Sequence, residues 1–423
     1  MFKIGIECES IEAETWGVGR IVNKLLENIA ARPELTNEFR FFLYFKSRIP
    51  NLPFLNNPIF IKKVIGVPSF SLYYYMLLPI KLWLEKLDLV FFPNYMLSPL
   101  FRGKSLVMLT EDIYNEIRRP DLPLRYKLAY KIFAEWWAAK HATKIMAISE
   151  TSKTEVAKLF KVRPDRITVN QLGVDKPREH SAFSVQRSAE TGPYTLHPVP
   201  YILYVGQAFP RRHLRETMLA FEQLTSPNPT TARPGLAIDM QGPALQLIAV
   251  GKDKYNPQII KKLAEDINRR LGREGIPGSR SSTDVLQDKT SQAKLVELSL
   301  PGIIYKEYVP EDELSELYAG AKLLIYVSSK EAFGLPPLEA LAYGIPAVVA
   351  DEPINHEIYG GNVFLTKQPI TTETIAEAVK DGLNNETKRQ KIKESAERIL
   401  EKYTWQKHTD RFLEIARSCK SQT

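Results

Sequence analysis

Cysteine is scarce in this chain of 423 residues, which contains only Cys8 and Cys419. Two cysteines at opposite ends of a sequence provide neither the disulfide framework of a small secreted domain nor the spacing of a cysteine-rich metal site. We therefore expect a protein of a reducing compartment. The start of the sequence turns acidic, at Glu7, Glu9 and Glu12, where a secretory signal would have its apolar run, so no cleaved signal is expected.

Long hydrophobic runs are absent as well. The longest uncharged stretch, 64–80, contains Pro68 and Pro79 and is shorter than the roughly 20 apolar residues that a membrane-spanning helix needs. We therefore expect no segment of this chain to cross a membrane. The composition, 44% hydrophobic and 25% charged, is that of an ordinary globular protein. The length predicts two domains, each large enough to bury its own core.

The positive charge is unevenly distributed along the chain. Residues 1–175 hold 25 Lys and Arg against 18 Asp and Glu (+7), while the remaining residues hold 32 against 31 (+1), which gives the net charge of +8. The basic excess of the first part favours anionic lipid or an acidic substrate, and an unevenly charged surface explains it equally well. No basic cluster is accompanied by a nucleic-acid recognition motif, so nucleic acid is not expected as a partner.

Apolar residues recur in the pattern of two α/β domains. Residues 2–6 alternate like a short strand, a loop with Gly17 and Gly19 follows, and apolar residues then recur at helical spacing from Ile21 to Ile29. Further strands are expected at 40–45, 89–92, 105–109, 144–148, 201–205, 245–250, 302–305 and 321–327, and helices at 124–141, 214–224, 257–271, 311–319, 371–384, 386–403 and 405–418. Such alternation predicts mostly parallel sheets with both faces covered by helices.

Segments without apolar periodicity mark the domain organisation. Residues 176–199 have the composition of a linker, so we expect a first domain at 1–175 and a second at 200–403. The helix at about 404–423 is a candidate to pack back on the first domain. Two further segments, 226–242 and 272–291, are interpreted as surface insertions.

The most informative stretch is 331–348, which follows an apolar strand. Gly334 permits a tight turn or the close approach of a ligand, and Pro336 or Pro337 suits the first position of a helix. Unpaired N–H groups and the dipole at such a helix start suit a phosphate group. Glu339 can complement the dipole or accept hydrogen bonds from vicinal hydroxyls such as those of a ribose. The residues alone thus favour a nucleotide site and leave a simple capped helix open.

The spacing of Glu331 and Glu339 resembles the Glu-x7-Glu signature of retaining nucleotide-sugar glycosyltransferases with the GT-B architecture, specifically glycosyltransferase family 4. Other segments resemble this family in chain order: Gly17-Val18-Gly19-Arg20, Asp88 with Pro93-Asn94-Tyr95, 147–153, 164–167, 173–175, Tyr204-Val205-Gly206, Pro210-Arg211-Arg212, Val250-Gly251-Lys252, and Tyr308-Val309 with Glu313-Leu314. The resemblance covers nearly the whole chain apart from the linker and insertions. It implies two Rossmann-like parallel-sheet domains that face a central cleft, the first binding the acceptor and the second the donor.

The resemblance also assigns roles to residues. It places Arg212 at the position of the family's phosphate-binding Lys, with Arg211 as a weaker candidate, because fixed cations stabilise a departing sugar diphosphate. It places Glu331 beside the transferred sugar and Glu339 on the ribose. The further donor-binding candidates are Gly17, Gly19, Gly206, Gly251, Tyr308, Val309, Phe333, Gly334 and Leu335. The alternative for each charged residue is an ordinary solvated side chain.

One departure from the family concerns Glu111, which lies where many relatives have the His of a His-Asp pair. A carboxylate cannot donate the hydrogen bond of an imidazole unless it is protonated. It would instead stabilise an oxocarbenium-like centre or orient the acceptor hydroxyl. Asp112 matches the family and is expected to support the site without touching the substrate. The six histidines show no ligand spacing and the family needs no metal, so we expect neither a metal ion nor a cofactor.

An aromatic stretch at 69–78 continues into Lys81, Trp83 and Lys86. Tyr, Trp and flanking Lys residues are typical of a membrane interface, and the basic helix at 125–140 would assist. The alternative is that both are helices packed on the first sheet. Peripheral contact of the first domain with a membrane, and a lipid-linked acceptor, are therefore left open.

Taken with the resemblance, these features predict a cytoplasmic, retaining hexosyltransferase that acts in surface polysaccharide or glycolipid synthesis. It would transfer a hexose, mannose from GDP-mannose being the first choice, to a saccharide or lipid-linked hydroxyl. Retention is expected by front-face attack, with the leaving phosphate accepting the proton of the acceptor. Two alternatives stay open: a nucleotide-sugar epimerase of GT-B fold, and a sugar-nucleotide-binding protein whose catalysis is impaired, which the departure at Glu111 suggests.

Overall fold

The computed structural model describes residues 1–12, 17–111, 123–177, 199–226, 244–272 and 301–420. The described chain forms two compact units: Met1–Gly173 with Lys402–Thr423, and Val174–Glu401. The unit boundaries thus fall at 173/174 and 401/402, where the sequence suggested 175 and 403. Asp112, the greater part of the expected linker and nearly all of both expected insertions lie outside the described residues.

The sheet of unit 1 consists of parallel strands in the order β3-β2-β1-β4-β5-β6-β7. Their bounds are β1 Phe2–Glu7, β2 Phe39–Phe45, β3 Phe60–Val64, β4 Leu89–Phe92, β5 Ser105–Met108, β6 Lys144–Ala147 and β7 Ile167–Val169. Sequence periodicity missed β3, which contains two adjacent lysines, and β7, which has only three residues. The strand order reverses between β1 and β4, and the crevice beyond the carboxyl ends at such a reversal is where open α/β sheets bind ligands.

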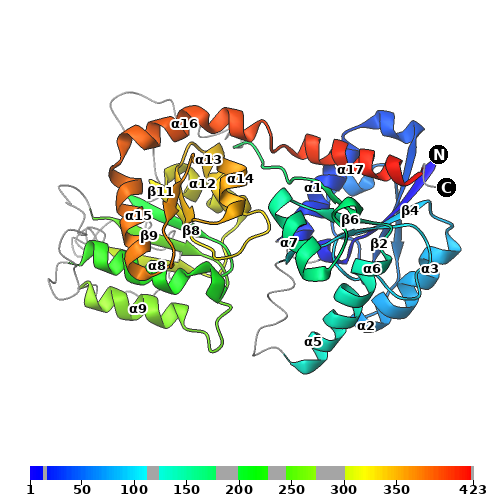
Figure 1. Ribbon diagram of the computed structural model, residues 1–423, viewed down its shortest axis with the longest axis horizontal. Helices are drawn as coiled ribbons and strands as arrows, with labels where there is room; N and C mark the ends of the chain where they lie inside the picture. The colour runs from blue at the N-terminus through cyan, green and yellow to red at the C-terminus, as the bar shows by residue number, and fades with distance from the viewer. Residues whose placement is uncertain (13–16, 112–122, 178–198, 227–243, 273–300, 421–423) are drawn as a thin grey trace. The chain divides into compact units, whose positions relative to one another are not determined.

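Helices cover both faces of this sheet (Figure 1). They are α1 Val18–Ala30, α2 Phe70–Leu72, the π-helical η4 Tyr73–Leu77, α3 Leu78–Leu84, α5 Leu124–Tyr130, the π-helical η5 Lys131–Ala138, α6 Ala139–His141, α7 Glu150–Phe160 and α17 Trp405–Lys420, with 3-10 turns η1 Glu9–Ile11, η2 Pro33–Asn37, η3 Pro53–Asn56 and η6 Pro164–Arg166. The expected loop around Gly19 is wrong, because α1 begins at Val18 and Gly19 lies in its first turn. Gly17, at φ +62°, precedes the helix.

The sheet of unit 2 is also parallel, in the order β10-β9-β8-β11-β12-β13, and reverses between β8 and β11. Its strands are β8 Tyr201–Val205, β9 Gln246–Val250, β10 Gly302–Lys306, β11 Leu323–Tyr326, β12 Ala347–Ala350 and β13 Phe364–Thr366. Its helices are η7 Pro210–Arg212, α8 Leu214–Thr225, α9 Ile260–Arg270, α12 Glu311–Gly320, α13 Leu335–Ala342, α14 Pro353–Tyr359, α15 Thr372–Asn384 and α16 Glu386–Leu400. The two parallel-sheet domains expected from the sequence are thus confirmed. No helix in the described ranges is long and apolar enough to span a membrane.

The last helix, α17, packs on unit 1. Its apolar residues recur at spacings of three and four, and Phe412 on this stripe contacts Phe91 of β4 with ring centroids 5.1 Å apart. Arg417 donates two hydrogen bonds to the Glu38 carboxylate, at 2.9 and 2.7 Å. Burial of the stripe, at about 25 cal/mol per Å² of apolar surface, supplies the stabilisation that holds the C-terminal segment on the first sheet.

The start of α17 is closely packed against the segment that follows β7. A Cβ atom added to Gly173 would overlap backbone atoms of Thr404 and Trp405. Next to this crossing, the buried His408 donates from Nδ1 to the Gln171 carbonyl oxygen at 2.9 Å. Burial lowers the pKa of His408 to about 4, against the effect of this hydrogen bond, so the ring is neutral in the folded protein.

Gly173→Ala is expected to destabilise unit 1 by about 1–3 kcal/mol, because backbone atoms on both sides cannot yield to the added methyl group. Urea unfolding followed by circular dichroism measures the change. The control is Gly360→Ala, where φ is +53° but a Cβ would meet nothing within 4 Å, so its cost reports left-handed backbone strain alone. Equal stability of Gly173→Ala and the unchanged protein would contradict the close packing.

His408 predicts a loss of stability in mild acid. Its folded-state pKa of about 4 lies below the ordinary 6.5, so the unfolded chain binds a proton that the folded chain excludes. The resulting stabilisation is complete above pH 6.5 and falls by roughly 3 kcal/mol on acidification to pH 4. Unfolding free energies of the unchanged protein and of His408→Gln across this range check the sign, since the Gln variant should lose less.

Candidate functional site

The candidate site lies in unit 2, at the carboxyl ends of the strands where the sheet order reverses. Gly206 directly follows β8 and Gly251 directly follows β9, with φ values of +142° and +144°. A Cβ atom on Gly251 would overlap the carbonyl oxygen of Gly206. The two loops therefore touch through their backbones, and glycine is required at 251 for the contact.

An ion cluster joins the loops that follow β8 and β11. Arg212 donates to the Glu331 carboxylate through Nε at 2.7 Å and through Nη2 at 3.3 Å, which is a bidentate pair. Arg211 adds a bond from Nη1 to Glu331 Oε1 at 2.7 Å. The side chains are 16% exposed for each arginine and 9% for the glutamate. The cluster holds two positive charges and one negative charge, so it has a net charge of +1.

The cluster is ionised at all ordinary pH values. Burial opposes ionisation of Glu331, but the charges of Arg212 and Arg211 outweigh it and lower the pKa of Glu331 to about 2. Burial likewise opposes the charge of Arg212, and the nearby Glu331 carboxylate nevertheless raises the pKa of Arg212 well above its usual value. A carboxylate of such low pKa is a poor general base at neutral pH. The geometry suits Glu331 for holding cations and accepting hydrogen bonds from a ligand.

Aromatic rings surround the two arginines. The Arg212 guanidinium carbon lies 5.3 Å from the ring centroid of Tyr326 and 5.8 Å from that of Phe209. The Arg211 guanidinium carbon lies 5.2 Å from the Phe209 ring. These distances are those of cation–π contacts, which strengthen when water is excluded. Sequence reasoning missed both aromatic residues, although Tyr326 ends a buried strand that points at the site.

Gly334 and α13 lie just beyond Glu331. Gly334, at φ +85°, precedes the helix, and Leu335 takes its first position. The proline expected at the first position is instead at the second, Pro336, and Pro337 follows it. Because proline has no N–H group, the helix start offers an anion the amides of Gly334 and Leu335 rather than a full turn of donors. Phe333 is buried beside them.

Glu339 lies in the second turn of α13 and is 8% exposed. Tyr318 of α12 donates a hydrogen bond from its hydroxyl group to Glu339 Oε2 at 2.7 Å. The Tyr318 ring also stacks on Tyr343, with ring centroids 5.5 Å apart. The sequence analysis did not predict a role for Tyr318, because local spacing gives no sign that α12 and α13 lie side by side.

The remaining donor-binding candidates lie at other places. Tyr308 and Val309 follow β10, two strands from β8 in the sheet, with Tyr308 half-exposed and Val309 buried. Gly17 and Gly19 belong to unit 1. The structure therefore brings Gly206, Gly251, Arg211, Arg212 and Glu331 together directly. Gly334 lies near the Tyr326 ring, since a Cβ atom added to Gly334 would be 3.7 Å from it.

Glu111 lies in unit 1 just beyond β5 and is buried. Ser152, in the first turn of α7, donates its hydroxyl proton to Glu111 Oε2 at 2.5 Å. Ser149 precedes the helix and accepts a bond from the Ser152 amide at 2.9 Å. The position that the resemblance to the family links with a histidine therefore holds a hydrogen-bonded carboxyl group. Its partner Ser152 was part of a segment that resembled the family, but its contact with Glu111 was not predicted.

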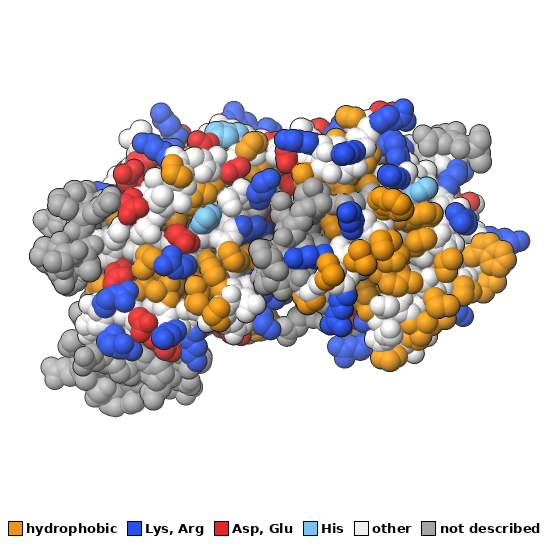
Figure 2. Space-filling view, turned by 60° about the horizontal axis from the view of Figure 1, so that its bottom comes forward, with side chains coloured by type: hydrophobic (Ala, Val, Ile, Leu, Met, Phe, Trp, Pro, Cys, Tyr) orange, Lys and Arg blue, Asp and Glu red, His pale blue; other side chains and the backbone are white. Residues whose placement is uncertain are grey.

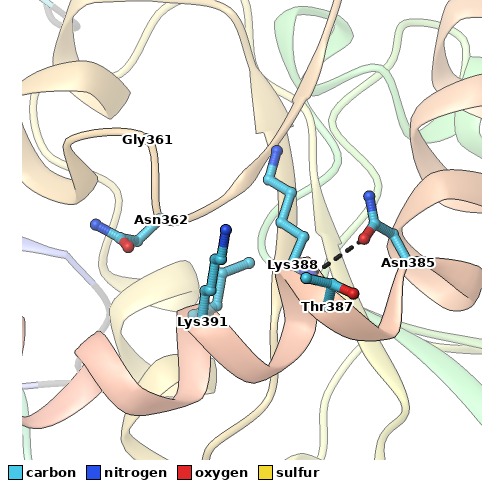
Figure 3. A pocket seen from close by; sticks show the side chains of 7 residues that line it. Gly361, Asn362, Asn385, Thr387, Lys388 and Lys391 are labelled. Atoms are coloured by element: carbon cyan, nitrogen blue, oxygen red, sulfur yellow. Dashed lines mark hydrogen bonds between the residues drawn. The ribbon is translucent and has the colours of Figure 1, made fainter.

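A pocket of about 380 Å³ lies between the segment that leads into β13 and the start of α16 (Figure 3). Gly361 and Asn362 line it before β13 begins, and Lys388 and Lys391 line it from α16. Because β11 and β13 run parallel, the residues before β13 and Glu331 after β11 lie at different ends of the strands. This pocket is thus separate from the candidate site. Among the described residues, no group of three or more His, Cys, Asp or Glu side chains could hold a metal ion.

Comparison with known proteins finds similarity to glycosyltransferases. The family model described as "Glycosyl transferases group 1" matches residues 277–399, which include Glu331, Gly334 and Glu339. The "O-antigen chain mannosyltransferase B" of Escherichia coli is 27% identical over 250 residues, which is 58% of this chain and 53% of that protein. The chain spans about half the length of the curated relatives that it matches.

Solved structures share the fold along the whole chain. WaaG, described as a glycosyltransferase involved in lipopolysaccharide biosynthesis, has a TM-score of 0.61 at 18% identity, covering 98% of this chain and 99% of that chain. Anabaena Alr3699/HepE in complex with UDP and glucose has a TM-score of 0.62 at 15% identity, covering 99% and 100%. With its two parallel-sheet domains, this chain has the GT-B fold of these solved structures, and its C-terminal segment is similar to the group 1 glycosyl transferases.

Proposed function

We propose that this protein is a retaining, metal-independent hexosyltransferase that uses a nucleotide diphosphate sugar. Mannose from GDP-mannose is the first choice of donor, and the acceptor is a hydroxyl of a saccharide or lipid-linked saccharide in surface polysaccharide or glycolipid synthesis. The observation that carries the proposal is the buried cluster of Arg211, Arg212 and Glu331 at the sheet reversal. Its net positive charge suits the diphosphate of a departing nucleotide.

The hydrogen-bond inventory of Arg212 supports this role. A guanidinium has five N–H donors, and within the described residues Arg212 uses three of them on Glu331 and on the Gln207 carbonyl oxygen. Two donors are left for a phosphate oxygen, in the planar geometry that favours Arg over Lys for such contacts. The amides of Gly334 and Leu335 would supply further donors.

The weak basicity of Glu331 fits a front-face mechanism. With a pKa of about 2, Glu331 does not take the proton of the acceptor at neutral pH, so the leaving phosphate receives it. Glu331 would orient the arginines and accept hydrogen bonds from the hydroxyls of the transferred sugar, while Glu339, held by Tyr318, would bind the ribose. Glu111 would orient the acceptor in unit 1, with Asp112 as its support. No nucleophile of the enzyme is then required.

The relatives support both the activity and its setting. The Escherichia coli relative is an O-antigen chain mannosyltransferase, and the Anabaena structure holds UDP and glucose. A cytoplasmic location fits such chemistry, because nucleotide sugars are the proposed substrates.

We expect Glu331→Gln and Arg212→Ala each to lower transfer at least about 100-fold, the effect of removing a fixed group that stabilises charge in a transition state. The assay follows nucleotide release and product mass with GDP-mannose, UDP-glucose, UDP-N-acetylglucosamine and dTDP-rhamnose. Arg270→Ala is the matched control, since Arg270 forms a similar two-bond pair with Glu222 elsewhere in unit 2. Full transfer activity in both Glu331→Gln and Arg212→Ala would contradict the proposal.

The same panel separates the alternatives. A nucleotide-sugar epimerase would change the sugar without any acceptor and without net nucleotide release. An impaired binding protein would be stabilised by one nucleotide sugar, through ligand binding to the folded state, and would release nothing. Slow release of a single nucleoside diphosphate without acceptor indicates a transferase.

We also propose that unit 1 contacts a membrane surface through two helical stretches. Their outward side chains form what we name the apolar face: Phe70, Leu72, Met76, Ile80, Trp83 and Leu84 from α2 to α3, and Leu124, Leu128, Ile132 and Trp136 from α5 to η5. The second set recurs at intervals of four residues, one side of a helix. Leu124, Trp83 and Trp136 are 77%, 72% and 67% exposed.

The core of unit 1 does not account for the apolar face. Other residues of the same stretches, such as Tyr74, Leu78 and Tyr130, already fill the core beneath. Tyr75 stacks on Phe133 with ring centroids 4.1 Å apart, which joins the two stretches. The helices thus pack on the sheet, as one interpretation of the sequence held, and also present apolar side chains outward.

Basic residues surround the apolar face. Lys81, Lys86, Arg125, Lys131 and Lys140 are exposed along the two stretches, and Lys140 Nζ lies 5.3 Å from the Trp136 ring centroid. Figure 2 shows hydrophobic side chains gathered on this unit among Lys and Arg side chains. Exposed apolar groups flanked by cations match the interface of a bilayer with anionic headgroups.

Sedimentation with vesicles tests the contact. Trp83→Glu with Trp136→Glu should lower binding to vesicles of equal phosphatidylcholine and phosphatidylglycerol by at least about tenfold, because acidic groups are repelled and apolar burial is lost. Ile49→Glu changes an exposed apolar residue outside the face and should bind as the unchanged protein does. Failure of the unchanged protein to bind these vesicles, or undiminished binding of the double variant, would contradict the proposal.

A further inference from the structure

A second buried glutamate lies at the sheet reversal of unit 1. Glu7 is the last residue of β1, which pairs with β4 on the side where the strand order reverses. Ligands of open α/β sheets bind beyond the carboxyl ends of strands at this position. The Glu7 side chain is fully buried, and the mechanism proposed above does not use it.

Hydrogen-bond donors surround the Glu7 carboxyl group. It accepts from the Glu9 amide at 2.7 Å, from the Tyr73 hydroxyl at 3.3 Å and from Asn94 Nδ2 at 3.4 Å. The nearby ammonium group of Lys46 pairs with Glu9, at 3.2 Å. The other titratable groups around Glu7 are Cys8, Glu12 and Tyr74.

This setting makes Glu7 a neutral acid at pH 7. Burial raises its pKa to about 8, further supported by the charge of Glu9 and opposed by the hydrogen bonds of the Glu9 amide and the tyrosines. Glu331 lies at the corresponding reversal of unit 2, but two arginines keep it ionised. The cationic edge of unit 2 suits a phosphate, whereas the neutral network around Glu7 suits an uncharged hydroxyl.

Asn94 connects this network with the surface. It follows β4, is partly exposed, and directs Nδ2 to the Tyr74 hydroxyl at 3.1 Å as well as to Glu7. Its Oδ1 accepts from the Met96 amide at 2.9 Å. The amide is therefore fixed in one orientation, and an amide oxygen has a second lone pair that can accept from a ligand hydroxyl. The neighbouring Tyr95 packs edge-on against Tyr130, with ring centroids 5.3 Å apart.

We propose that Asn94 binds a hydroxyl group of the acceptor sugar and that Glu7 is a positioning residue that holds the Asn94 amide for this contact. The inference rests on the proposed function, because it assigns the acceptor to unit 1. It names a neutral sugar as the ligand of this edge. Glu7 acts through Asn94 and does not itself touch the sugar.

Binding of simple glycosides tests the pair. Methyl α-mannoside, methyl α-glucoside and methyl α-galactoside are titrated against the full chain by saturation-transfer NMR. Asn94→Ala and Glu7→Ala should each lower the affinity for the glycoside that binds by about tenfold, which is the effect of one hydrogen bond lost or misdirected. Glu7→Gln, which keeps a neutral group of the same shape, should bind nearly as the unchanged protein does at pH 7.

The pH profile separates a positioning role from a purely structural one. Between pH 7 and pH 9.5 the affinity of the unchanged protein for the glycoside should change, because ionisation of Glu7 alters the hydrogen bond that it accepts from Asn94 Nδ2. Glu7→Gln should show a flat profile over this range. The control for folding is Asn57→Ala, since Asn57 also orders a turn of unit 1, through bonds to the Ala30 carbonyl and the Ile59 amide. It should lower stability and leave glycoside affinity unchanged.

Donor binding is measured in the same variants by calorimetry with GDP-mannose and UDP-glucose. Unchanged glycoside binding in Asn94→Ala, a wild-type pH profile in Glu7→Gln, or no binding of any glycoside to the unchanged protein would overturn the inference, whatever the donor result. Glycoside binding that is lost in Asn94→Ala, in a protein that binds no nucleotide sugar, would support the sugar site and contradict the proposed function instead.

Discussion

The candidate site depends on the burial of one carboxylate between two guanidinium groups. Moving charges out of water costs several kcal/mol for each ion, and only close pairing offsets the cost. Glu331 and Arg212 meet this condition with two hydrogen bonds, and Arg211 adds a third. Because the partners come from the loops after β8 and β11, the cluster connects the two strands between which the sheet order reverses. Removing Glu331 would leave two largely buried guanidinium groups without a counter-charge.

Other features of unit 2 follow from this connection. The contact of Gly206 with Gly251 brings the loops after β8 and β9 together beneath the arginines. The chain leaves Glu331 and reaches Gly334 within three residues, so the start of α13 is held beside the cluster. Two prolines then reduce the donors of that helix start to the amides of Gly334 and Leu335. The cluster thus provides the positive charge, and the backbone amides around it provide oriented hydrogen-bond donors.

Each unit has a glutamate near the reversal of its sheet order, and the two glutamates differ in protonation state. Glu331 has cations and is ionised, with a pKa of about 2, whereas Glu7 has hydroxyl and amide donors and a pKa of about 8. The difference arises from the neighbouring groups, because both side chains are largely enclosed, Glu7 fully buried and Glu331 9% exposed. An ionised, cation-bound edge and a neutral, amide-bearing edge are suited to a diphosphate and a sugar hydroxyl respectively.

Much of this protein was determined by the sequence alone. Alternating apolar periods predicted both parallel sheets, because local periodicity decides where strands and helices form. The resemblance of the spacing of Glu331 and Glu339 to a family signature predicted where the donor site would lie. Tertiary structure decided the rest. Glu331 meets Arg212 across 119 residues, Tyr318 meets Glu339, and Ser152 meets Glu111, because strand order, not spacing, brings distant segments together. The helix of Trp83 has apolar residues on all sides, so the sequence alone does not indicate which of them are exposed. Packing of one side against the core decides this. Glu7 likewise reads as an ordinary acid in sequence, and only its enclosure without a cation makes it neutral.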